Sequence, residues 1–216
     1  MSDQPADPIR QVAAWDFDGT ITRRDTLGGF LLHVAGRRRV ANAVARHATS
    51  LARGLGHNGR RDEAKAALLN SLLGGRRHDD LVAAGRSYAT RLTEGYRPTS
   101  LEQIDIHRAG GHELVIVSAS LRFYLDAVGE QLGFDHVIGV EMAVDATGHL
   151  TGALARPNVR AEEKAVRLSE WLMQSDRPPI GESSERAPSP VEIWAYGNSS
   201  GDDALLAMAD HPTRVE

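Results

Sequence analysis

The sequence predicts an α/β protein in which a doubly wound, mainly parallel sheet is interrupted by a long helical insert. Three short apolar runs, at residues 12–15, 114–117 and 191–196, are typical of buried strands. Between the first two runs, residues 22–108 carry apolar residues at helical spacing, and shorter helical stretches separate the later runs. Strands that alternate with helices favour a parallel sheet with helices on both faces, which is a Rossmann-like core.

The length and composition agree with one such core and one small insert. The chain has 216 residues, of which 41% are hydrophobic and 25% are charged, as in an ordinary globular protein. We expect a core of residues 10–21 and 109–216, a helical cap of residues 22–108 and a disordered lead-in at residues 1–9. Cysteine is absent, which excludes disulfides and thiolate chemistry. Neither a signal peptide nor a membrane-spanning run is present, so we expect a cytoplasmic protein.

In the first half of the chain, the apolar run at residues 12–15 leads directly into the polar residues 16–20. This pattern indicates a buried strand that ends in a loop. Glycines and Pro98 then divide the insert into five expected helices. These lie near residues 26–35, 38–54, 61–73, 79–93 and 99–109.

In the second half, apolar runs and helical stretches alternate. The expected elements are a strand at 114–117, a helix at 121–132, a hairpin of residues 137–144 and 149–154, a helix at 162–173, a strand at 191–196 and a helix at 204–209. Residues 175–190 are rich in Pro, Ser, Glu and Arg, and we expect a surface loop there. All three buried strands end in polar residues, at the sheet edge where α/β proteins bind ligands.

Two carboxylates, Asp16 and Asp18, follow the first strand directly. Like charges so close together raise the pKa of one carboxyl group unless a cation lies between them. Mg²⁺ is commonly held by one or two carboxylates together with substrate phosphate. One aspartate would then act as nucleophile and the other as general acid or base. The alternative is a simple Asp-x-Asp-Gly turn, whose side chains bond their own backbone.

Four separated motifs resemble those of the haloacid dehalogenase superfamily. They are residues 16–20, Asp-Phe-Asp-Gly-Thr; residues 115–118, an apolar strand that ends in Ser118; Lys164 at a helix start; and residues 197–202, Gly-Asn-Ser-Ser-Gly-Asp. The sequence is most similar to the phosphoserine-phosphatase-like subfamily IB, which also includes phosphatidylglycerophosphate phosphatases of type C. The resemblance covers about residues 12–209. It implies a haloacid-dehalogenase-like core, an all-helical C1-type cap inserted after the first motif, and Mg²⁺ as the cofactor.

The resemblance also implies a role for each matched residue. Asp16 would attack phosphorus to form an aspartyl-phosphate, and Asp18 would protonate the leaving alcohol and then activate water. Ser118 and Ala119 would bind the phosphoryl group, while Lys164 would supply positive charge to that group and to Asp16. Taken alone, Ser118 resembles a helix cap and Lys164 a surface residue. Only their order along the chain with the other motifs assigns them to the site.

The expected metal ligands are Asp16, Asp18, Asn198 and Asp202. Asp18 would contribute its backbone carbonyl. Asn198 departs from the family pattern, which usually has an aspartate at this position, and an amide brings no charge to the metal. We expect Asp202 to compensate by binding the metal directly or through water, or to hold Lys164.

The substrate is less well defined by the sequence. Asp25 replaces the glutamate that reads the amino group in phosphoserine phosphatases, and Arg160 is a candidate phosphate contact. Residues 22–108 carry 16 Lys and Arg against 8 Asp and Glu, which would suit an anionic substrate or an anionic membrane surface, or simply a solvated helix face.

These observations predict a Mg²⁺-dependent phosphatase. Its substrate would be a small, phosphoserine-like phosphometabolite or a phospholipid headgroup phosphate, and a nucleic-acid partner is not expected. Two alternatives stay open, a phosphotransferase or mutase with the same intermediate and a catalytically weakened binding or regulatory protein.

Overall fold

The structure is a computed structural model that describes residues 9–49, 58–175 and 190–216. The expected lead-in, apart from Ile9, lies outside these ranges, as do most of the loop expected at 175–190 and the end of the helix expected at 38–54. Within the described ranges, no helix combines the length and the apolar character that crossing a membrane requires.

A five-stranded sheet forms the centre of the molecule, with strand order β3-β2-β1-β6-β7. Every pair of neighbouring strands is parallel. The five strands are β1 (Arg10–Trp15), β2 (Glu113–Leu121), β3 (His136–Val140), β6 (Val191–Gly197) and β7 (His211–Arg214). The predicted mainly parallel, doubly wound core is therefore confirmed.

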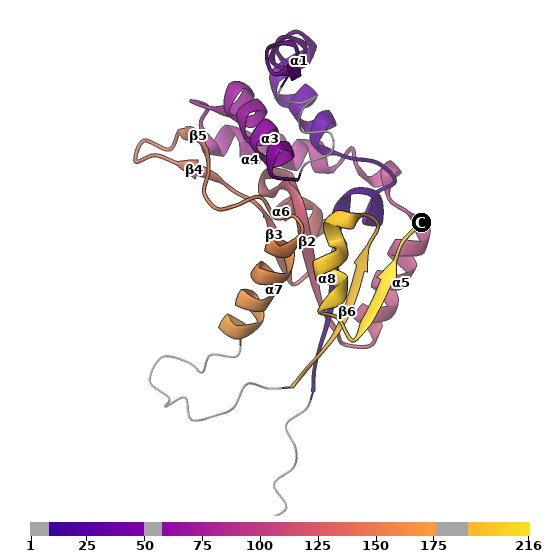
Figure 1. Ribbon diagram of the computed structural model, residues 1–216. Helices are drawn as coiled ribbons and strands as arrows, with labels where there is room; N and C mark the ends of the chain where they lie inside the picture. Colours follow the sequence, from indigo (N-terminus) through magenta and orange to yellow (C-terminus); the bar gives the residue numbers. More distant parts are fainter. Residues whose placement is uncertain (1–8, 50–57, 176–189) are drawn as a thin grey trace, which may run out of the picture.

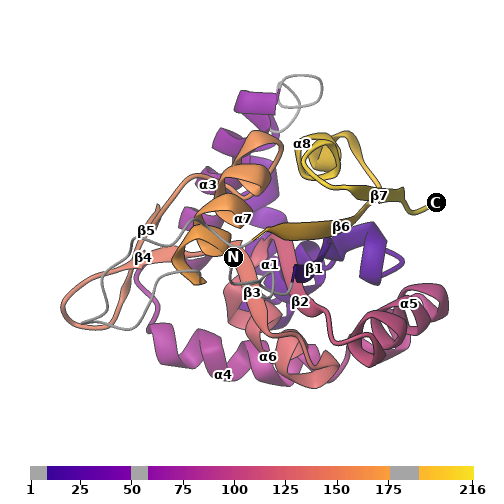
Figure 2. The same cartoon turned by 90° about the horizontal axis from the view of Figure 1, so that it is seen from below.

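Helices cover both faces of this sheet. Figure 2 shows α5 and α6 on one face and α7 and α8 on the other. Their bounds are α5 (Pro98–Ala109), α6 (Arg122–Leu132), α7 (Glu162–Ser175) and α8 (Asp203–Ala207). Both faces are buried in this way, which explains why the central strands read as continuous apolar runs.

A second helical layer lies beyond the carboxyl ends of the strands (Figure 1). It consists of α1 (Leu27–Arg46), α3 (Asn58–Leu73) and α4 (His78–Ala89), followed by the short turn η2 (Thr93–Gly95). The antiparallel hairpin of β4 (Met142–Val144) and β5 (Leu150–Leu154) packs against α3 and extends this layer. The division into core and cap stays a prediction. Because α5 packs against β2, its position beside the sheet favours a boundary nearer Arg97 than residue 108.

Two strand expectations differ from the structure. The run at 137–144 is not one hairpin strand, because β3 pairs with β2 in the main sheet and only β4 pairs with β5. The break falls at Glu141, the charged residue between Val140 and Met142, which interrupts the apolar sequence. Strand β7 was not expected, since its sequence is His-Pro-Thr-Arg and all four residues are exposed. An edge strand that pairs on one side tolerates such polar residues and a proline.

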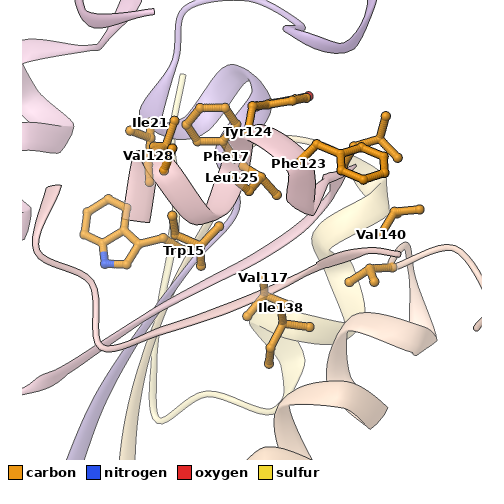
Figure 3. Close-up of a cluster of buried hydrophobic side chains, with 14 of the residues drawn as sticks. Trp15, Phe17, Ile21, Val117, Phe123, Tyr124, Leu125, Val128, Ile138 and Val140 are labelled. Carbon is orange, nitrogen blue, oxygen red and sulfur yellow. The ribbon is translucent and has the colours of Figure 1, made fainter. Parts of the chain in front are cut away.

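Aromatic side chains fix the loop that follows β1. Phe17 and Tyr124 are both fully buried, and their ring centroids are 6.5 Å apart (Figure 3). Trp15, the last residue of β1, stacks on Tyr196 of β6 with a centroid distance of 3.7 Å. These contacts anchor the backbone on both sides of Asp16, so that the residues after β1 are held in a fixed position.

Candidate active site

The loop after β1 is a wide turn, η1 (Phe17–Ile21), in which Asp18 and Gly19 are not helical. Gly19 has a φ of 83°, which favours glycine. A Cβ at this position would also lie 2.0 Å from the Nδ2 atom of Asn198. The Asn198 amide therefore lies directly against Gly19, the residue that follows Asp18.

Asp16, Lys164 and Asp202 form a buried ion cluster at the ends of β1 and β6. The Lys164 Nζ atom is 2.6 Å from Asp16 Oδ1 and 2.6 Å from Asp202 Oδ1. The three residues are 6%, 2% and 2% exposed, in the order Asp16, Lys164, Asp202. Burial raises the pKa of Asp16, against the opposing effect of the Lys164 ammonium. Burial also works against the charged form of Lys164, but the two carboxylates raise the pKa of this amine above its usual range.

Asp202 also organises the loop that follows β6. Its Oδ2 atom accepts hydrogen bonds from the backbone N–H groups of Asn198 (3.1 Å) and Ser199 (2.9 Å) and from the Ser199 hydroxyl (2.9 Å). Burial works to raise the pKa of Asp202, but Lys164 and the Ser199 hydrogen bonds lower it below its usual range. Both carboxylate oxygens are thus engaged by protein donors. This geometry favours the alternative in which Asp202 holds Lys164.

Asp18 has a different environment, because its carboxylate meets only neutral donors. Thr26 donates to Oδ1 through its N–H (2.8 Å) and its hydroxyl (2.6 Å), and the Ser120 hydroxyl donates to Oδ2. Burial raises the pKa of Asp18 to about 6, although the Ser120 and Thr26 hydrogen bonds oppose the increase. A carboxyl group with such a pKa can exchange a proton near neutral pH.

One pocket of about 550 Å³ collects every residue that the sequence assigned to the site. The predicted residues that line it are Asp16, Asp18, Asp25, Ser118, Ala119, Arg160, Lys164, Asn198 and Asp202. Its core side is formed by the ends of β1, β2 and β6 and the start of α7. Its insert side carries charged residues from before α1 and from α3, namely Arg23, Arg24, Asp25, Arg61, Asp62 and Lys65. The roles of the predicted residues stay proposals.

Local structure explains several of these positions. Ser118 is buried, and its Oγ atom accepts a hydrogen bond from the Ser120 N–H (3.1 Å). Ala161, between Arg160 and the helix that carries Lys164, has a φ of 52°, and its N–H donates to the Gly201 carbonyl (2.9 Å). Asp25 is exposed, and its Oδ1 atom accepts from the Leu27 N–H (3.0 Å) at the start of α1.

Four further polar residues reach the site but were not predicted from the sequence. Thr20 donates its hydroxyl to Asp16 Oδ2 (3.0 Å), Thr26 and Ser120 hold Asp18, and Lys65 lines the insert side. Thr20 belongs to the first motif and Ser120 lies two residues after the second, so their hydroxyls were the available signal. The sequence gives less indication of Thr26 and Lys65, because only the packing of the insert brings these two residues to the pocket.

The donor set suits a hard divalent cation. In the part of the chain that the structure describes, no three or more His, Asp or Glu side chains are grouped to hold a metal ion. A cation here would therefore need amide and carbonyl oxygens in addition to carboxylates. The Asn198 amide lies against Gly19, the residue after Asp18. The two oxygens of Asp16 accept from the Thr20 hydroxyl and the Lys164 ammonium, which leaves capacity to bind a cation. An all-oxygen set with few protein ligands matches Mg²⁺, which usually keeps several waters and binds substrate phosphate.

Comparison with known proteins gives an independent line of evidence. The model of the haloacid dehalogenase-like hydrolase family matches residues 13–207. Protein CicA from Caulobacter vibrioides (strain NA1000 / CB15N) is 30% identical over 200 residues, which cover 92% of this chain and 83% of that protein. A phosphoserine phosphatase from Archaeoglobus fulgidus is 26% identical over 119 residues, which cover 55% of this chain and 30% of that protein.

Solved structures share the fold. A protein of unknown function from Bordetella pertussis Tohama I superposes with a TM-score of 0.71 at 21% identity, covering 93% of this chain and 87% of that one. A phosphoserine phosphatase in its apo form has a TM-score of 0.58 at 15% identity and covers 94% of this chain and 84% of that one. At sequence identities of 21% and 15%, these two superpositions show a shared fold and nothing further.

Proposed function

The chain belongs to the haloacid dehalogenase-like hydrolase family and is a phosphatase of that family, and we propose that it hydrolyses phosphate monoesters through an aspartyl-phosphate on Asp16. One observation carries this proposal. Two carboxyl groups lie in one pocket, Asp16 buried and Asp18 partly buried, and their partners differ in charge. Asp16 is paired with the ammonium group of Lys164 at 2.6 Å, whereas Asp18 has only neutral donors and a pKa of about 6.

In the first step, a carboxylate oxygen of Asp16 attacks phosphorus, and the bond between phosphorus and the ester oxygen breaks. Asp18, in its protonated form, gives its proton to the departing alkoxide, so that an alcohol leaves. Lys164 lies against Asp16, where its charge opposes the negative charge that builds on the transferring group. Ser118, at the end of β2, supplies a hydroxyl to a phosphoryl oxygen.

In the second step, water attacks the phosphorus of the aspartyl-phosphate. Asp18, now ionised, accepts a proton from this water, and the bond between phosphorus and Asp16 breaks. The products are inorganic phosphate and the free carboxylate of Asp16, so that the enzyme returns to its starting state. The helical layer beyond the strand ends limits access of other water to the pocket.

We further propose Mg²⁺ as the cofactor. Asp16, the backbone carbonyl of Asp18 and the amide oxygen of Asn198 would hold it. When bound, it would neutralise charge on the phosphoryl oxygens and on Asp16. Asp202 would act on the site through Lys164, which it contacts at 2.6 Å.

The substrate that we propose is a small phosphate monoester, or a phospholipid headgroup phosphate, with additional negative charge. Support comes from the exposed arginines on the insert side of the pocket, Arg23, Arg24 and Arg61. A panel of monoesters that differ by one carboxylate or phosphate group tests this proposal. Equal kcat/KM for the neutral and charged members would contradict it.

The proposed activity is tested by phosphate release from an aryl phosphate, with Mg²⁺ and with a chelator. We expect turnover that requires Mg²⁺ and that is lost in Asp16→Asn. Asp203→Asn is the matched control, because Asp203 is an exposed carboxylate paired with Arg214 (2.5 Å) outside the pocket. Release of phosphate with water as the only acceptor separates hydrolysis from phosphotransfer. If wild type shows no turnover above Asp16→Asn, the proposed activity is wrong.

A further inference from the structure

Lys65 lies on α3 and reaches across the pocket to the core. Its Nζ atom donates to the backbone carbonyl of Ala119, the residue after Ser118, and to Oδ1 of Asn158 at 2.7 Å. Ala119 and Asn158 belong to two different core segments, the last residues of β2 and the loop before α7. A single ammonium group therefore links the helical insert to the end of strand β2 and to the loop before α7.

Asn158 is itself held in one orientation. Its Nδ2 atom donates to Asp62 Oδ1 at 2.7 Å, while its Oδ1 atom accepts from Lys65. A carboxylate can only accept and an ammonium can only donate, so the amide has one orientation that satisfies both. Asp62 and Lys65 are three residues apart on α3 and share one helix face. We refer to Asp62, Lys65 and Asn158 as the polar bridge.

The composition of the chain makes Lys65 distinctive. Among 25 Lys and Arg residues, only Lys65 and Lys164 are lysines, and both line the same pocket. Elsewhere the chain uses arginine for its cationic side chains. A compact ammonium with three donors can bond a carbonyl and an amide oxygen in a confined space, which a planar guanidinium does less readily. Burial lowers the pKa of Lys65 to about 8, so the group is still largely protonated at neutral pH.

The carbonyl that Lys65 holds belongs to the same peptide unit as the N–H of Ser120. Because the peptide is planar, fixing the Ala119 carbonyl also fixes the direction of that N–H. The Ser120 N–H donates to Ser118 Oγ (3.1 Å), and the Ser120 hydroxyl donates to Asp18. One peptide unit thus connects Lys65 with two residues of the proposed reaction, Ser118 and Asp18.

We propose that Lys65 is a positioning residue, which closes the helical insert onto the Ala119–Ser120 peptide and thereby orients Ser118 and Asp18. This inference rests on the proposed function. The polar bridge would couple closure of the insert to assembly of the phosphoryl site, because both the Ser118 hydroxyl and the Asp18 carboxyl depend on the peptide that Lys65 fixes. When the insert moves away, the peptide loses its lysine partner.

The first test compares wild type with Lys65→Met. We expect kcat to fall about 10- to 100-fold, since small displacements of positioned groups have effects of that size. The loss should be equal for small and bulky aryl phosphates whose leaving groups have the same acidity, because Lys65 would position Ser118 and Asp18 and would not itself bind the leaving group. Glu63→Gln, an exposed position on the same helix, is the control and should retain wild-type activity. A loss that varies with the size of the leaving group at constant acidity would overturn the positioning role, because it would show that Lys65 binds the leaving group.

The second test uses the polar bridge itself. Asn158→Asp places a carboxylate against Asp62 and should lower kcat. In the double variant with Asp62→Asn, the amide at position 62 donates to the carboxylate at position 158, which still accepts from Lys65. The double variant should therefore recover most of the activity. Asp62→Asn alone keeps an acceptor for Asn158 and should have a small effect. Failure of the double variant to recover, while its stability to urea equals that of wild type, would overturn the inference.

Hydrogen exchange gives a readout that does not depend on turnover. Lys65→Met should speed amide exchange in the segment that contains Ala119 and Ser120, with unchanged exchange in the central strand β1. If wild type has no phosphatase activity, the proposed function fails, but this exchange comparison still tests the bridge. Unchanged exchange together with wild-type kcat in Lys65→Met would overturn the inference and leave the proposed function intact.

Discussion

The two sides of the pocket differ in how firmly their charged groups are held. On the core side, Asp16, Lys164 and Asp202 are at most 6% exposed, and Lys164 contacts each aspartate at 2.6 Å. On the insert side, Arg24 and Arg61 line the pocket but are exposed to solvent. Charges fixed in a buried cluster suit a reaction step that needs constant geometry, whereas exposed charges suit recognition of different substrates.

The same contrast exists between the two aspartates of one turn. Asp16 faces a buried cation, while Asp18 faces two hydroxyls and one N–H. Although the two residues are only two positions apart, their partners come from different elements, α7 for Asp16 and the start of α1 together with β2 for Asp18. The proposed division of work between nucleophile and acid would thus follow from the partners and not from the residue type.

The largest loss of kcat is expected for a substitution on the core side of the pocket. Asp16→Asn removes the nucleophile but keeps its shape, so we expect kcat to fall by at least about 10⁴-fold. Phosphate release under saturating substrate measures this effect. Residual activity within about tenfold of wild type would mean that another group attacks phosphorus.

Lys164→Met should affect both activity and stability. The change leaves Asp16 and Asp202 buried without their shared cation, which should lower the free energy of unfolding by about 3 kcal/mol and kcat by roughly 10³-fold. Urea unfolding and phosphate release measure the two effects. The stability loss should be smaller at pH 5 than at pH 8, because protonation of Asp16 relieves the unpaired charge. Unchanged stability at pH 8 would contradict the account of the buried cluster.

The pH dependence should separate Asp18 from Asp16. Protonated Asp18 is needed when the leaving alcohol is poor, so kcat/KM for an alkyl phosphate should fall as the pH rises through about 6. An aryl phosphate with an acidic leaving group needs little protonation and should show a weaker fall. Ser120→Ala removes a hydrogen bond that lowers the Asp18 pKa, so the fall should move to higher pH by up to about one pH unit. A fall that stays at the same pH in Ser120→Ala would argue that another group titrates.

The smallest effects are expected for the exposed arginines of the insert side. Arg24→Gln and Arg61→Gln should each change KM by about two- to fivefold with kcat unchanged, since exposed charges contribute little each. The change should be larger for a more anionic substrate and should shrink with added salt. A loss of kcat equal to that of Lys164→Met would remove the distinction between the two sides.

The core side of the site could be predicted from the sequence because it depends on strand ends. Asp16, Ser118 and Asn198 each follow an apolar run, and parallel strands bring their carboxyl ends to one edge. The order of the motifs along the chain was sufficient to assign Lys164 and Asp202 to the site. The contacts of Lys164 with both Asp16 and Asp202 became visible only in the structure, because the sequence spacing does not indicate which carboxylates a lysine contacts.

The insert side could not be predicted in this way. The polar bridge joins Asp62 and Lys65 to Asn158, more than 90 residues away, and an amphipathic helix pattern does not show which core loop its polar face will contact. Strand β7 was missed for a related reason, since its exposed His-Pro-Thr-Arg sequence lacks an apolar pattern and only its pairing with β6 makes it a strand.

The central claim is that a buried aspartate becomes phosphorylated, and the most direct measurement is the identity of the labelled residue during turnover. Acid-quenched enzyme from the first turnover should carry one phosphoryl group on the peptide that contains Asp16, and the label should disappear as phosphate is released. Asp18→Asn, in which the water-activating group is lost, should accumulate this species. Turnover without any phosphorylated peptide, or with the label on a residue other than Asp16, would contradict the account.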